Sequence, residues 1–78
     1  MNVSDALRTI IAQQGMTQAS VAHELGVSQP AIASVLAVGN PQTRVLVSLL
    51  GSLDYELVAV PKSAKLPNNS YVLEVVKK

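Results

Sequence analysis

The sequence predicts a mainly α-helical protein with a C-terminal β element, namely four helices followed by two short strands. Apolar residues recur at spacings of three and four along 5–52, which is the helical period. Along 55–60 and 71–76 they alternate instead and are rich in β-branched types, as in strands. With 78 residues the chain has room for one core, so we expect 1–78 to form a single domain.

The first two helices are predicted from their end signals. We expect a helix over 5–14, capped by Ser4, and a second helix over 18–25, capped by Thr17. Gly26 directly follows the second helix, where a left-handed residue commonly ends one.

The next two helices are predicted over 29–37 and 41–52. Ser28 is the N-cap candidate of the third helix, whose first turn tolerates a proline. Asn40 followed by Pro41 predicts the start of the fourth helix, because asparagine caps well and proline suits the first helical position.

The two predicted strands flank a polar loop with two prolines. An isolated hairpin is marginal in water, so we expect the strands to pair with those of a second copy in a homodimer. The competing interpretation is that they receive a different protein. The expected dimerisation residues are Tyr55, Leu57, Val58, Val60, Tyr71, Leu73 and Val75.

Composition narrows the class of protein. There is no cysteine and only one histidine, so neither a disulfide framework nor a Cys-based metal site is expected, and we predict no metal and no cofactor. A core of this size supplies little stability, which favours oligomerisation. Neither a signal peptide nor a membrane span is apparent, so we expect a cytoplasmic protein without a membrane partner.

The middle of the chain has the spacing of a helix-turn-helix. Ala22 is small where the following helix crosses it, and Gly26 supplies the positive φ of the tight turn. Val27, Ile32 and Val35 are expected to fill the angle between the two helices. The same pattern would also suit two helices that serve only as scaffold.

At these residues the sequence resembles the phage repressor and Cro-type helix-turn-helix family, also called the xenobiotic-response-element family. The likeness covers 7–61 and includes the runs Met-Thr-Gln at 16–18 and Leu-Gly-Val-Ser-Gln at 25–29. It implies a lambda-repressor-like four-helix domain in which Gln18 binds backbone phosphate and Gln29 reads base edges. Residues 49–61 look more loosely like HipB-like and HigA-like antitoxins.

The residues also predict double-stranded DNA as a partner on physical grounds. Docked N-terminal end first in the major groove, the third helix presents its outer face to the bases, and Gln29 can pair with two atoms of adenine. Arg44 is the one cation expected near the phosphates, although it can equally be an ordinary exposed residue. The expected DNA-binding residues are Thr17, Gln18, Ser28, Gln29, Pro30, Ala33, Ser34, Asn40, Gln42, Thr43 and Arg44.

No catalytic arrangement is apparent, and we do not expect an enzyme. His23 is a lone histidine without a ligand set or a triad partner at suitable spacing. The five carboxylates are scattered along the chain, so paired acid–base chemistry has no support.

Three functional hypotheses follow. The first is a transcriptional regulator, a repressor that binds a palindromic operator as a homodimer. The alternative is an antitoxin that binds a toxin protein and represses its own operon. A third, an interaction module that has kept the fold without DNA binding, follows from the lack of basic residues on the third helix.

Overall fold

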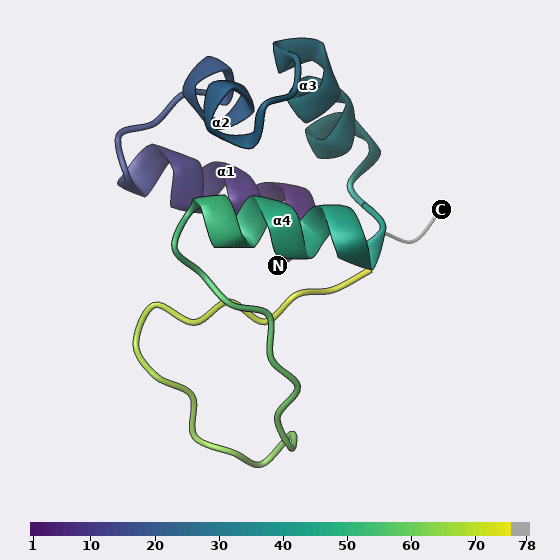
Figure 1. Cartoon of the computed structure of the whole chain (residues 1–78). Helices are drawn as coiled ribbons and strands as arrows, with labels where there is room; N and C mark the ends of the chain where they lie inside the picture. The colour runs from purple at the N-terminus through teal and green to yellow at the C-terminus, as the bar shows by residue number, and fades with distance from the viewer. Residues whose placement is uncertain (76–78) are drawn as a thin grey trace.

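The computed structural model describes residues 1–75 and places four helices there, followed by an irregular tail. In Figure 1, α2 and α3 lie above α1 and α4, and the tail makes a wide loop below them. The helices are α1 (Val3–Gln13), α2 (Gln18–Leu25), α3 (Gln29–Val38) and α4 (Thr43–Ser52).

An aliphatic core holds the helices together. α2 packs against α3 and α4, and α1 packs against α3. The largest fully buried side chains are Leu7, Ile10, Val21, Leu49 and Leu53. All are aliphatic, in keeping with a chain that has neither Trp nor Phe, so the core depends on close packing of branched side chains.

The two middle helices begin and end where local signals indicate. The Thr17 side chain accepts a hydrogen bond from the Ser20 amide, and the Ser28 side chain accepts one from the Ala31 amide. Gly26 ends α2 in the left-handed region, at φ 72°. α2 has the predicted bounds, and α3 runs one residue beyond its predicted end.

α1 begins two residues earlier than predicted, and Ser4 is not its cap. Asn2 caps the helix instead, its side-chain oxygen accepting from the Asp5 amide at 2.8 Å. Ser4 lies inside the helix and is buried, with its hydroxyl turned toward α3.

α4 begins at Thr43 rather than at position 41. Gln42 is the cap residue, with extended backbone and no side-chain cap bond, and its carbonyl accepts the Leu46 amide at 2.9 Å. A residue before proline favours extended backbone over helical backbone. Asn40 precedes Pro41, so this preference explains why Asn40 belongs to the link between α3 and α4 and does not begin α4.

The predicted C-terminal strands are wrong for the part of the chain that the structure describes. Over 55–60 and 71–75 there is no strand, only an isolated bridge between Asn2 and Glu74, and position 76 of the expected second strand lies outside the described residues. The two arms of the tail, 55–60 and 71–75, form no ladder with each other. Residues 56–60 of the first arm are exposed. Tyr55, Tyr71 and Leu73 pack on the core from the arms.

The second arm is held at both ends of α1. The Glu74 amide donates to the Met1 carbonyl at 2.9 Å, and the Glu74 carboxylate lies 2.6 Å from the Met1 ammonium. That ammonium lowers the pKa of Glu74 through its hydrogen bond and its charge. The Tyr71 hydroxyl donates to Gln13 Oε1 at 2.9 Å, which fixes the arm along α1.

Within residues 1–75 no single helix is long and apolar enough to cross a membrane. α2 and α3 reach the length and apolar composition of a membrane span only when they are taken together. The chain bends by 112° between these two helices.

Candidate nucleic-acid interface

α2 and α3 are joined by a tight turn and cross steeply. Their axes bend by 112°, within the range of about 90–120° that a helix-turn-helix requires. The Val27 amide donates to the Ala22 carbonyl at 3.0 Å across the turn, and Ala22 is only 2% exposed. A small residue at that position lets the two helices approach each other closely.

α3 has one buried side and one free side. Ile32 and Leu36 are 3% and 2% exposed and face the core. The opposite side carries the exposed residues Gln29, Pro30, Ala33 and Ser34, which we call the α3 outer face. No other part of the described chain hydrogen-bonds to the side chains of Gln29 or Ser34, so both remain available to a ligand.

The α3 outer face offers a small set of chemical groups. The Gln29 amide, at the first helical position, has one donor and one acceptor group, the pattern that matches the major-groove edge of adenine. Pro30 and Ala33 add apolar surface of the kind that contacts a thymine methyl. An α-helix fits into a major groove about 12 Å wide, so these groups can reach base edges there.

The residues predicted at the start of α2 are in place, but some of their polar atoms are already used. Thr17 and Ser20 form a capping box, with the Thr17 amide donating to Ser20 Oγ at 2.8 Å. Gln18 is half-buried. The positive end of the helix dipole at this terminus favours an anion such as a phosphate.

The start of α4 lies at the flank of α3. Arg44 lines a hollow of about 410 Å³ together with Ala31 and Val35 of α3, which places its positive charge along the flank of α3. Asn40, Gln42 and Thr43 are exposed before and beside it.

Val27 does not fill the angle between the helices as expected. It is 46% exposed and lines the same hollow between α3 and α4. Ile32 is buried and Val35 half-buried, so these two residues alone provide the expected packing.

Among the described residues, charge is sparse along α3. No charged residue occurs in α3, and Arg44 is the first one after it. Glu24, on α2, lines a different hollow with Met16 and Asp54, away from α3. The α3 outer face is therefore close to neutral, and it neither repels nor strongly attracts a phosphate backbone.

Sequence reasoning missed the residue that ties α1 to α3. The buried Ser4 hydroxyl donates to the Leu36 carbonyl at 2.5 Å, and the Arg8 guanidinium reaches the same oxygen at 3.5 Å. Ser4, Leu7 and Ile11 have helical spacing, so the apolar face of α1 was the signal that Ser4 points inward.

The predicted dimerisation residues divide into two groups. The rings of Tyr55 and Tyr71 contact each other, with their centroids 6.1 Å apart. Both residues pack with Leu73 against the core. The remaining members are exposed, namely Leu57, Val58, Val60 and Val75. The residues of the first group pack within this chain. Only those of the second group present apolar surface that a partner could cover.

Comparison with known protein families, with curated proteins and with solved structures finds no match for this chain. The likeness to phage repressors stays a prediction.

Proposed function

We propose that this protein is a sequence-specific regulator of transcription that binds double-stranded DNA through the α3 outer face, acting as a homodimeric repressor. The observation that carries the proposal is the steep α2–α3 pair with one buried and one free side on α3. A helix-turn-helix needs this arrangement so that its second helix can enter the major groove.

Base reading is assigned to Gln29, with Pro30, Ala33 and Ser34 beside it. A bidentate glutamine contact to adenine discriminates by about 1–3 kcal/mol against the wrong base. The set has two small apolar members and no cation, so we expect a preference for A·T pairs. Ser28, which caps α3, lies next to the same bases.

Phosphate contacts are assigned to the residues at the starts of α2 and α4. Thr17, Gln18, Asn40, Gln42 and Thr43 supply neutral donors there, and Arg44 supplies one charge. Contacts of this kind set register and orientation but give little affinity without many cations. A single subunit is therefore expected to bind weakly, and two subunits on one operator are needed.

Self-association is supported by the apolar tail. Val58 is 67% exposed, Val72 64% and Val75 76%, which is unusual for valines in so short a segment. Covering these side chains with a second copy would bury them and give a dimer that carries two α3 helices. Half-sites about 34 Å apart, one turn of DNA, are then expected.

The experiment that tests DNA reading is selection of binding sites from random duplex DNA, first with the wild type and then with Gln29→Ala. We expect the wild type to select a palindrome and Gln29→Ala to lose its preference at one base pair in each half-site. An unchanged motif for Gln29→Ala would show that this residue is not a reader.

The exposed valines of the tail also favour a second candidate, an antitoxin whose tail binds a toxin protein while α3 represses the operon. Sedimentation of the purified chain separates the two. A dimer that Val58→Asp converts to monomer favours the homodimeric repressor. A monomer that forms a defined complex with a protein encoded beside it in the native operon favours the antitoxin.

A further inference from the structure

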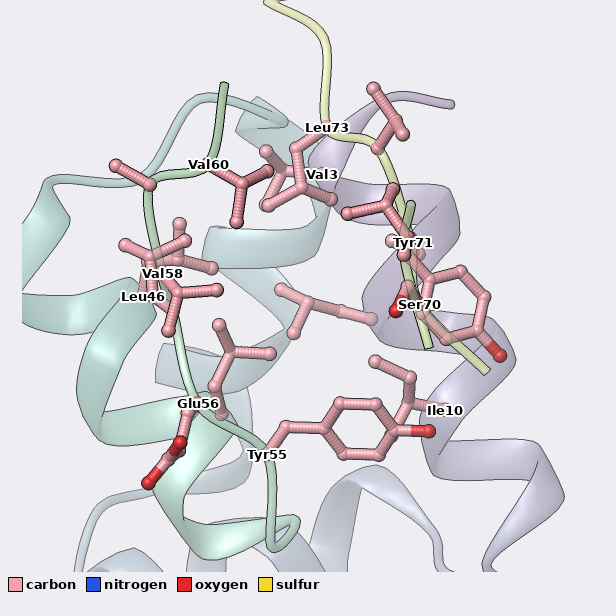
Figure 2. Close-up of a pocket in the computed structure, with 17 residues that line it drawn as sticks. Val3, Ile10, Leu46, Tyr55, Glu56, Val58, Val60, Ser70, Tyr71 and Leu73 are labelled. Atoms are coloured by element: carbon pink, nitrogen blue, oxygen red, sulfur yellow. The ribbon is translucent and has the colours of Figure 1, made fainter. Parts of the chain in front are cut away.

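One mainly apolar space in the described chain lies between the tail and the helices. It is a cavity of about 450 Å³ with walls from α1, α4 and both arms of the tail. Figure 2 shows Val3 and Ile10 of α1, Leu46 of α4, and Val60 and Leu73 of the arms around it. Sites for small molecules commonly have volumes of about 300–1,000 Å³ and mainly apolar walls, and this space falls within that range.

The walls indicate what kind of molecule fits. Glu56 is the one charged residue among those that line the cavity, and in Figure 2 its carboxylate points away from the centre. A charged ligand would lose its hydration without gaining a partner, whereas an apolar one would gain dispersion contacts on several sides. The side-chain hydroxyls among the lining residues belong to Tyr55, Ser70 and Tyr71. Ser70 and Tyr71 donate to Pro67 and Gln13, whereas the Tyr55 hydroxyl has no hydrogen bond to the described residues.

From this lining we propose that the cavity is a binding site for an uncharged, largely apolar small molecule, with room for one hydrogen-bonding group near Tyr55. Occupancy would fix the tail against α1 and α4, because the ligand would contact all three. The site shares no residue with the α3 outer face, so this inference does not depend on DNA binding.

The test uses N-phenyl-1-naphthylamine, an uncharged dye that fluoresces strongly when it leaves water. We expect its fluorescence on titration into the full chain to saturate at one dye per chain. Ala6 is 2% exposed and lines the cavity, so Ala6→Leu places extra carbons inside it. We expect this variant to weaken dye binding ~tenfold or more, the scale of a modest overpacking penalty.

The matched control is Ala12→Leu, the same substitution at an exposed position of the same helix. It should bind the dye as the wild type does. Wild-type affinity in a folded Ala6→Leu variant, an equal loss in both variants, or fluorescence that never saturates would each overturn the proposal.

A second pair keeps the test decisive if Ala6→Leu fails to fold. Val60 and Val47 are each 48% exposed, but only Val60 lines the cavity. Val60→Ser should weaken dye binding by a few-fold or more through lost apolar contact, and Val47→Ser should not. Sedimentation of both variants, at the concentration of the titration, separates loss of the cavity from loss of self-association. Equal affinities for the two would contradict the proposal.

Discussion

The buried hydroxyl of Ser4 in α1 donates a hydrogen bond to the carbonyl of Leu36 in the last turn of α3. The last carbonyls of a helix have no partner within it, and this one is shielded from water. The bond therefore satisfies a helix end and fixes α3 on α1. The orientation of the proposed recognition helix depends on a residue 32 positions away in the sequence.

Ser4→Ala should lower the free energy of unfolding by about 1–2 kcal/mol, because it leaves the Leu36 carbonyl with only the distant Arg8 guanidinium. Urea unfolding followed by circular dichroism measures this. Ser48→Ala is the control, since the Ser48 hydroxyl bonds an exposed carbonyl of its own helix. Equal losses in the two variants would contradict a special role for Ser4.

Gly26→Ala should destabilise the protein by about 1–2 kcal/mol through backbone strain alone. The φ of Gly26 is 72°, and an added Cβ would meet nothing within 4 Å, so steric contact contributes nothing. Gly51→Ala is the matched substitution, because Gly51 lies inside α4 and also has open space around it. Gly51→Ala should raise the free energy of unfolding by about 0.5–1 kcal/mol. A lower free energy of unfolding in that variant would contradict this explanation.

DNA affinity should depend only weakly on salt. Among residues 1–75, Arg44 at the flank of α3 is the cation that we assign to phosphate contact, so a dimer would neutralise about two phosphates through it. The expected slope of log K against log salt is then about −2. Titrations of the selected duplex at several salt concentrations measure it. Arg44→Gln should flatten the slope, whereas Lys62→Gln at an exposed position of the tail should leave it unchanged. A wild-type slope several times steeper would show that other cations take part.

The contact between Glu74 and the Met1 ammonium should depend on pH. The ammonium lowers the pKa of Glu74, so the contact is complete above the ordinary pKa of a glutamate carboxyl and is lost as the pH falls through the lowered value. Carbonyl NMR shifts of Glu74 follow the titration. Acetylating the amine removes its charge and should raise the midpoint toward the ordinary value. An unchanged midpoint would show that the ammonium is not the cause.

Signals confined to a few neighbouring residues predicted the middle of the fold well. Thr17, Ser28 and Gly26 affect only the helical turn next to them, as caps or as a left-handed end residue. α2 accordingly begins and ends where these residues predict. Ser4 shows the limit of such signals. A serine near a helix start suits a cap or an inward hydrogen bond, and only the position of α3 decides between them.

The tail could not be predicted in the same way. Tyr71 and Leu73 alternate with exposed residues, and this period of two arises whenever an extended segment lies against a surface. A strand additionally needs a neighbour for its backbone, which the local sequence does not encode. The helices provide the surface here, so the burial pattern was predictable and the sheet was not.

The central claim is that the α3 outer face lies in the groove of a duplex. Ala33→Glu places a carboxylate in the middle of that face, and Ala12→Glu places one on the exposed side of α1. Binding of both variants to the duplex selected by the wild type should be measured by fluorescence anisotropy, with circular dichroism as the check of folding. We expect Ala33→Glu to lose about 100-fold or more in affinity, because a like charge against the DNA costs several kcal/mol, and Ala12→Glu to bind as the wild type does. Wild-type affinity in a folded Ala33→Glu variant would contradict the claim.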